Sequence, residues 1–468
     1  GNLGLTQKGR IEYAAVGGHL NIDAIDNSGG VDCSDHEVNL KILLGIAVKD
    51  EGLERAQRDE VLRDVEGEVA ELVLYDNYLQ AQIISQEVAE SAERLEAYED
   101  LMLSLEESGM IDRGLESLPS SEQMAERMRN DAPMFRPELC VLLSYAKFKL
   151  EDELRDSELL DDLLFQPSLL AYFPERVRRE FGHLIDRHPL RGDLISTIVS
   201  NTVVNSQGIT FASRLSIETG ASLADVVRAY WIARTVTGAP ERWSAIETLD
   251  GTLEPSVQNV LMVGVDSLVE EVTRWYLAHD LKRSAAEVGA DVAPRFEELA
   301  AVIEQAGSDA WRERRHQLAE ELVNLGVEDD LARRHVYQHA LAHGPALLET
   351  ALTAGRPLVQ TAEAFFLAGE RLRIDWLERR LATLDADDRY ERLAVRALRD
   401  DLRSLRRDVA ARTLAEAGTA AEGLTAFTEQ RSLALERLER LIEREAEGND
   451  PTLAELTVFV RQLRSAVS

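Results

Sequence analysis

The sequence contains little cysteine and no long apolar run. Two cysteines, Cys33 and Cys140, among 468 residues are too few for a disulfide framework, which favours a cytoplasmic protein. The longest apolar stretches, such as 40–48, are far shorter than the roughly twenty residues of a membrane-spanning helix. The amino end also lacks the basic and apolar segments of a signal peptide. We therefore expect a protein that neither enters nor crosses a membrane.

Positive charge is also scarce. The chain has 52 basic and 85 acidic residues, giving a formal net charge of −33, and only six of the basic residues are lysines. Binding to nucleic acid or to an anionic membrane surface needs clustered basic side chains, so we expect neither of these partners. A small anionic substrate stays possible, because one local basic pocket can act against the overall charge.

The chain has no initiator methionine and begins inside an apparent turn, which suggests a fragment of a larger polypeptide. It is otherwise typical of a globular protein, with 45% hydrophobic and 29% charged residues. Residues 9–14 alternate well enough to predict a short strand, and a loop rich in Gly, Asn and Asp follows. From Asp35 onward the hydrophobic pattern repeats every 3.6 residues. We expect a mainly α protein, with a short α/β remnant before a large all-α region.

Local signals place several of the expected helices. Ser120 and Gln123 form a capping box, and Pro137 is suited to the first turn of another helix. After Ala346, long charged segments carry leucine at three- and four-residue spacings. Turns interrupt them, so we expect antiparallel helical hairpins rather than an extended coiled coil.

The stretch "DNSGGVDCSDHE", residues 26–37, can be interpreted in two ways. As a helix entry, Ser34 and Glu37 form a capping box, and Gly29 and Gly30 supply positive φ angles in the preceding turn. As part of a binding site, the glycines let a flat ligand approach the backbone, and Asn27 can both donate to and accept from a carboxamide. Ser34 would offer a hydroxyl at the positive end of a helix, which suits a carboxylate. The two interpretations are compatible.

Two elements resemble a known family. "GNLGLT" at the amino end and "NSGGVDCS" further on closely resemble the end of the catalytic region of the large bacterial NAD-specific glutamate dehydrogenases. The resemblance continues through "MFRPELCVLLSYAK" and "LRGDLISTIVSNTVVNSQGITFASRL", so it covers most of the chain. It implies that residues 1–45 end a Rossmann-like NAD-binding domain, that residues 46–130 are helices packing back on the catalytic region, and that residues 131–468 form a C-terminal helical domain.

The resemblance also assigns roles to individual residues. Asn27 matches the family asparagine at the nicotinamide, and Asn2 matches the asparagine near the nicotinamide ribose. Val31 matches a residue lining the substrate, and Ser34 matches the serine that binds the side-chain carboxylate of the substrate. Relatives acting on leucine, valine or phenylalanine generally have an apolar residue at the position of Ser34, so a hydroxyl there favours an acidic substrate.

The implied activity is oxidative deamination of L-glutamate to 2-oxoglutarate and ammonia, with NAD as the hydride acceptor. The family's catalytic lysine and carboxylate are expected upstream, so no catalytic residue is assigned in this chain, and the fragment alone should be inactive. The resemblance also suggests a homo-oligomer, a tetramer. One alternative is an NAD-dependent dehydrogenase of another amino acid. The other is a helical scaffold or oligomerisation module with no catalytic share.

Other candidate residues favour structural roles. His335, His339 and His343 follow at four-residue spacing and could supply zinc ligands, but no nearby group completes a ligand shell, so no metal site is expected. His36 is expected to lie at the surface beside Asp35, and Cys33 to be a small buried residue. The five tryptophans are expected to anchor helix cores: Trp231, Trp243, Trp275, Trp311 and Trp376.

Overall fold

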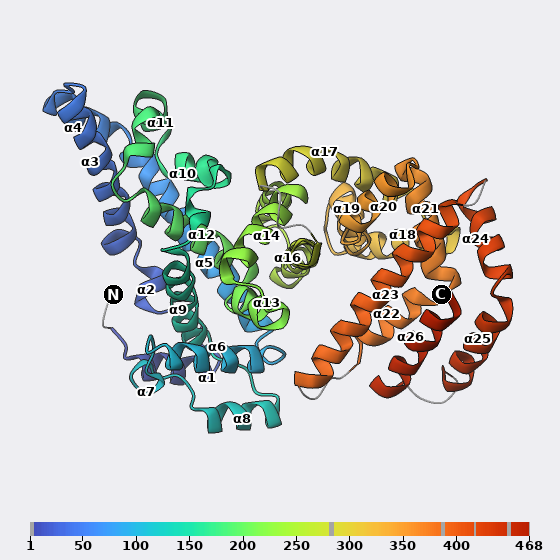
Figure 1. The fold of residues 1–468 in the computed structure, drawn as a ribbon. Helices are drawn as coiled ribbons and strands as arrows, with labels where there is room; N and C mark the ends of the chain where they lie inside the picture. The colour runs from blue at the N-terminus through green and yellow to red at the C-terminus, as the bar shows by residue number, and fades with distance from the viewer. Residues whose placement is uncertain (1–3, 280–284, 385–388, 416–417, 447–450, 468) are drawn as a thin grey trace. The chain divides into compact units, whose positions relative to one another are not determined.

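The computed structural model describes residues 4–279, 285–384, 389–415, 418–446 and 451–467. These residues form helices joined by short connections, as Figure 1 shows, and none of them forms a β-strand. None of the described helices combines the length and the apolar composition that crossing a bilayer requires. The prediction of a mainly α chain is therefore confirmed.

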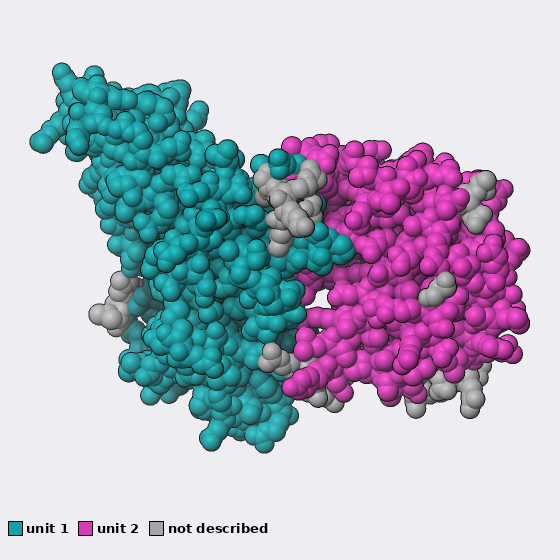
Figure 2. Space-filling model, viewed as in Figure 1, with its two compact units in different colours: residues 1–232, 276–287 teal, residues 233–275, 288–468 magenta. Residues whose placement is uncertain are grey.

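The chain divides into two compact units, coloured separately in Figure 2: residues 1–232 with 276–287, and residues 233–275 with 288–468. The first unit contains α1 (Gln7–Ala15), α2 (Asp23–Asp26), η1 (Ser28–Asp32), α3 (Cys33–Asp50), α4 (Arg55–Asp64), α5 (Glu66–Ala89), α6 (Leu95–Glu107), α7 (Arg113–Glu116), α8 (Ser121–Asn130), α9 (Arg136–Leu154), η2 (Glu158–Asp161), η3 (Leu163–Phe165), α10 (Gln166–Tyr172), α11 (Glu175–Phe181), η4 (Gly182–Arg187), α12 (Arg191–Gln207) and α13 (Phe211–Thr219).

Three helices contribute residues to both units: α14 (Leu223–Val236), α16 (Pro255–His279) and α17 (Ala285–Ile303). The second unit adds α15 (Ala239–Glu247), α18 (Asp309–Asn324), α19 (Asp329–Leu341), α20 (Gly344–Ala354), α21 (Leu358–Arg371), α22 (Ile374–Ala382), α23 (Arg389–Ala415), α24 (Ala420–Glu429), α25 (Ser432–Ala446) and α26 (Leu453–Val467).

The amino-terminal segment is helical where a strand was predicted. Residues 9–14 lie within α1, and the Thr6 hydroxyl caps this helix by accepting a hydrogen bond from the Gly9 amide at 3.1 Å. A helix satisfies its own backbone groups, whereas a strand needs a neighbour to pair with, and none of the described residues forms one. The predicted strand, and with it the α/β remnant, is therefore wrong for the residues that the structure describes.

The first unit is built around α5, α9 and α12, which pack on one another. The capping box of Ser120 and Gln123 at the start of α8 is confirmed, with both of its hydrogen bonds present. Pro137 lies in the first turn of α9, as predicted. The central helices support the amino-terminal segment, because α1 packs on α9, α2 packs on α5, and α3 packs on α5.

The second unit ends in a bundle. One hydrophobic core joins residues of α21 to α26, among them Leu377, Leu402, Leu424, Leu456 and Phe459. The charged helices thus pack against one another in this core, and their arrangement as antiparallel hairpins stays a prediction. Of the five tryptophans, Trp231 and Trp311 are buried as predicted, while the other three are half-buried.

Candidate functional site

The glycine-rich stretch forms a single turn of π-helix that runs directly into α3. In η1, the Cys33 amide donates to the Ser28 carbonyl, which closes the wide turn. The Asn27 side chain caps this turn, because its Oδ1 accepts a hydrogen bond from the Gly30 amide at 2.9 Å. A Cβ atom on residue 30 would lie 2.4 Å from that Oδ1, so glycine is needed there for the amide to reach the backbone. Single π turns inside helices occur frequently at functional sites.

The helix entry therefore differs from the capping box that was predicted. Ser34 lies inside α3, whose first residue is Cys33 and whose N-cap residue is Asp32. The Glu37 carboxylate pairs with Lys41 one turn later instead of reaching back to the N-cap amide. Neither Gly29 nor Gly30 has a positive φ. These predictions were wrong because the preceding π turn extends the helix backward and removes the need for a serine cap.

The residues predicted to bind ligand lie along η1 and the start of α3. Val31 is 64% exposed, Ser34 is exposed, and Asn27 is partly buried beneath the turn that it caps. Val31 and Ser34 are three residues apart along a nearly continuous helix, so they share one face. Asn2 lies outside the described residues. The structure thus places three of the four predicted residues within eight consecutive residues, from the N-cap of η1 to the first turn of α3.

The other side of the same segment is buried against other helices of the first unit. His36 is only 3% exposed, and its ring stacks on that of Tyr172 with centroids 4.3 Å apart. The prediction of a surface position for His36 is therefore wrong. Potential ligand atoms of Asp32, His36 and Asp76 all lie within 4.8 Å of one another. The sequence offered one signal for this cluster, the four-residue spacing of Asp32 and His36, which places both on one helix face.

Burial shifts the acid–base properties of this cluster. Desolvation, reinforced by the neighbouring Asp76 and Asp35 charges, raises the pKa of Asp32 to about 6, against the lowering effect of Lys147. Burial raises the pKa of Asp76, again against Lys147. Lys147 is 8% exposed, and desolvation lowers its pKa to about 8 although Asp76, Glu151 and Asp32 attract its charge.

Hydrogen bonds hold the first turns of α3 against the rest of the unit. The Asn39 amide donates to the Tyr172 hydroxyl at 3.0 Å, and that hydroxyl donates to the Asp35 carboxylate at 2.8 Å. Upstream, the Arg10 guanidinium donates to the Asn21 carbonyl and pairs with Asp23, both at 2.7 Å. Tyr172 therefore fixes the start of α3, and Arg10 fixes the segment that leads into α2.

The three histidines of α19 and the α20 N-cap show no comparable arrangement, and neither do the cysteines. His335 is half-buried, His339 is exposed, and His343 is buried with its ring 5.2 Å from that of Phe365. The absence of a metal there stays a prediction. Cys33 and Cys140 are free thiols, and Cys33 is half-buried rather than fully buried.

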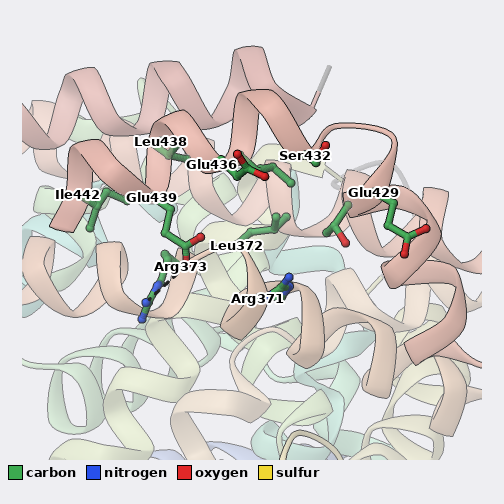
Figure 3. A pocket seen from close by; sticks show the side chains of 11 residues that line it. Arg371, Leu372, Arg373, Glu429, Ser432, Glu436, Leu438, Glu439 and Ile442 are labelled. Carbon is green, nitrogen blue, oxygen red and sulfur yellow. Dashed lines mark ion pairs between the residues drawn. The ribbon is translucent and has the colours of Figure 1, made fainter.

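A small cavity of about 160 Å³ lies in the second unit between the α21–α22 junction and helices α24 and α25, as Figure 3 shows. It has charges of both signs, and Arg373 lies 3.8 Å from Glu439 across it. Cavities that hold cofactors and drug-sized ligands are about 300–1,000 Å³, so this cavity does not fit a dinucleotide. Its lining residues are Arg371, Leu372, Arg373, Thr428, Glu429, Ser432, Leu435, Glu436, Leu438, Glu439 and Ile442.

Comparison with known proteins agrees with the resemblance of the glycine-rich turn. Residues 1–87 match the family described as bacterial NAD-glutamate dehydrogenase, catalytic domain, and residues 131–465 match glutamate dehydrogenase, C-terminal. The two matched regions thus define part of a glutamate dehydrogenase. The chain belongs to the bacterial NAD-specific glutamate dehydrogenase family.

Three proteins named NAD-specific glutamate dehydrogenase illustrate the similarity. Those of Halomonas elongata and Pseudomonas aeruginosa are each 36% identical to this chain, over 402 and 407 residues, which is 86% of the chain and 25% of each relative. That of Mycobacterium tuberculosis is 32% identical over 476 residues, covering 99% of the chain and 29% of the relative. The chain therefore spans between a quarter and a third of the length of these relatives.

Proposed function

We propose that this chain supplies one wall of the nicotinamide and substrate site of an NAD-dependent glutamate dehydrogenase. The whole enzyme would oxidatively deaminate L-glutamate to 2-oxoglutarate and ammonia, with NAD accepting the hydride. The observation that carries the proposal is the turn itself. It presents Val31 and Ser34 on one exposed helix face, and Asn27 caps the same turn, within the region that matches the catalytic domain.

The residues of the turn suit the cofactor. The Asn27 Oδ1 is occupied by the Gly30 amide, so its Nδ2 is left to donate to the carboxamide oxygen of the nicotinamide. Gly29 has open space where a side chain would stand, which lets a flat ring approach the backbone. NAD would supply the hydride acceptor. Asn2 is proposed to contact the nicotinamide ribose on the strength of the family resemblance alone.

Ser34 is proposed to recognise the acidic side chain of the substrate. Its exposed hydroxyl lies in the first turn of α3, where the backbone dipole favours negative charge, and it can donate to a carboxylate there. Val31 would pack against the aliphatic part of the same side chain. The lysine that polarises the substrate and the carboxylate that moves the proton are assigned to residues that this chain does not contain, so the chain alone is expected to be inactive.

Replacing Ser34 by alanine tests this assignment. In a full-length subunit, Ser34→Ala is expected to raise the KM for glutamate and to lower kcat/KM by roughly 10–100-fold, because a hydrogen bond to a charged group contributes about 1.5–3 kcal/mol. Ser28→Ala is the matched control, since ordinary glutamate dehydrogenases carry alanine at that position, and it should leave both constants unchanged. An unaltered KM in Ser34→Ala would instead favour a dehydrogenase of another amino acid.

The scaffold alternative predicts a different result. If residues 1–37 line the active site, adding NAD and glutamate to the full-length subunit should slow amide hydrogen exchange in that segment. A helical module without a catalytic share would show the same exchange with and without the ligands.

The organisation of the subunit also stays a proposal. We propose that residues 1–45 complete the NAD-binding domain, that 46–130 pack back on it, and that 131–468 form the C-terminal helical domain. We further propose a cytoplasmic homo-oligomer, a tetramer, and light scattering on the full-length subunit measures its mass directly.

A further inference from the structure

We propose that Asp32, His36 and Asp76 form a binding site for one divalent cation of the zinc class. Asp32 and His36 come from η1 and the start of α3, and Asp76 comes from α5, which packs against both. The potential ligand atoms of the three residues lie within 4.8 Å of one another, close enough for one ion to contact all three after a small adjustment. The site lies in the first unit on the turn that also carries Val31, but none of its three residues is among the proposed NAD and glutamate contacts.

The buried His36 is an observation separate from the acidic pair. Its ring is 3% exposed and held by stacking on Tyr172, yet its Nδ1 atom has no hydrogen-bond partner among the described residues. An unpaired ring nitrogen in such a position is costly unless a further group binds there. Burial lowers the pKa of His36, so the ring is neutral near pH 7, which is the form that binds a metal.

The two carboxylates also lack a close positive partner. In the part of the chain that the structure describes, neither Asp32 nor Asp76 has an ion-pair partner within 4.0 Å. Two partly buried carboxylates at this separation repel each other, and each is desolvated. A cation bound between them would relieve both costs at once.

Lys147 is the group that opposes cation binding. Its ammonium donates to the Gln80 Oε1 atom at 3.2 Å and acts on Asp76 and Asp32 through the electric field without an ion pair to either. A charged lysine beside the site weakens the binding of a cation by direct repulsion. Removing the Lys147 charge should therefore strengthen metal binding. If the Lys147 ammonium were instead the cation that the two carboxylates normally hold, the wild type would bind no metal.

The donor set selects the class of ion. One imidazole nitrogen and two carboxylate oxygens suit zinc and related transition metals, and three protein ligands leave a position for water. Magnesium prefers oxygen ligands alone in octahedral geometry, so it should bind far more weakly.

The test is Zn²⁺ binding to the 468-residue chain, measured by equilibrium dialysis with elemental analysis and by competition with a chromophoric chelator. We expect one specific Zn²⁺ per chain. Asp76→Asn and His36→Gln should each weaken binding by about 100-fold or more, because even residues that only support a ligand contribute 10–100-fold. Lys147→Met should tighten binding by about tenfold or more. His316→Gln is the matched control, since His316 is an exposed histidine beside Glu320 in the second unit. The Zn²⁺ affinity of this variant should equal that of the wild type.

Several results would overturn the proposal. Equal Zn²⁺ affinity in the wild type, Asp76→Asn and His36→Gln would show adventitious binding only. An absence of specific binding in the wild type would show that Lys147 occupies the site, even if Lys147→Met bound the metal. Circular dichroism of each variant, recorded without metal, separates the loss of a ligand from the loss of the fold.

Discussion

Replacing Glu87 by alanine is expected to lower the free energy of unfolding of the first unit by about 3–5 kcal/mol. Glu87 is fully buried, and it joins three segments of the unit. One carboxylate oxygen accepts the Ile209 amide at 2.7 Å and pairs with Arg94 at 3.4 Å, while the other accepts the Tyr98 hydroxyl. Gly208 has φ +92°, and a Cβ there would lie 2.1 Å from the first oxygen. The alanine variant would leave the buried Ile209 amide and Tyr98 hydroxyl without this acceptor, while Arg94 would keep its ion pair with Glu90.

Hydrogen exchange measured by mass spectrometry localises this effect. Peptides covering 83–98 and 203–212 should exchange faster in Glu87→Ala. Glu87→Gln should lose less stability than Glu87→Ala, because its amide oxygen still accepts a hydrogen bond. Glu93→Ala is the matched control, since Glu93 is exposed and should change stability by no more than about 0.5 kcal/mol. Identical exchange in Glu87→Ala and Glu93→Ala would show that the carboxylate does not join these segments.

Replacing Arg406 by methionine is expected to destabilise the second unit by a similar amount, about 3–5 kcal/mol. Arg406 is 2% exposed, pairs with Asp375, and lies 2.9 Å from Glu378 and 5.2 Å from the Phe365 ring centroid. Gly369 leaves the space for its guanidinium, because a Cβ there would come within 2.8 Å of it. Without the arginine, two partly buried carboxylates would face each other with no cation between them.

The loss in Arg406→Met should depend on pH. Burial already raises the pKa of Glu378 above its ordinary value, and removing the Arg406 charge would raise it further. Between the ordinary and the raised pKa the folded state binds more protons than the unfolded state, so stability falls as pH rises through that window. The variant should therefore recover part of its stability near pH 5 relative to pH 8, as measured by urea unfolding at both values.

Further substitutions separate this charge effect from loss of packing. Combining Arg406→Met with Asp375→Asn and Glu378→Gln should restore stability, because no uncompensated charge remains buried. Arg379→Met, at an exposed arginine of the neighbouring helix, should have little effect at either pH. A loss in Arg406→Met that is equal at both pH values, and that the triple variant does not reduce, would contradict the role assigned to Arg406.

Local patterns determined much of the fold. The 3.6-residue repeat predicted a mainly α chain, and the Ser120–Gln123 box and Pro137 correctly placed two helix starts. Such signals act between residues a turn or less apart, so they can be recognised in the sequence. The prediction of a strand at 9–14 was wrong because six alternating residues are compatible with either structure. The Thr6 side chain caps and so favours the helix.

The glycine-rich turn was singled out by its composition, but its conformation was not predicted. A π turn in place of a serine cap changes which residues face outward, and it follows from the Asn27 side chain bonding to the Gly30 amide. The exposed positions of Val31 and Ser34 agree with the binding interpretation of the sequence, whose ligand contacts stay a prediction.

The sequence by itself determined the helical class and drew attention to the turn from Asn27 to Ser34. Only the tertiary structure decided which charged groups are buried and what surrounds them. Asp32 and His36 meet Asp76 only because α5 packs against η1 and α3, and Lys147 acts on both aspartates from α9, which packs on α5. Glu87 of α5 likewise meets the Ile209 amide only because folding brings the connection after α12 to it. The physical reason is that helix periodicity and capping depend on near neighbours, whereas desolvation and charge pairing depend on segments that folding brings together.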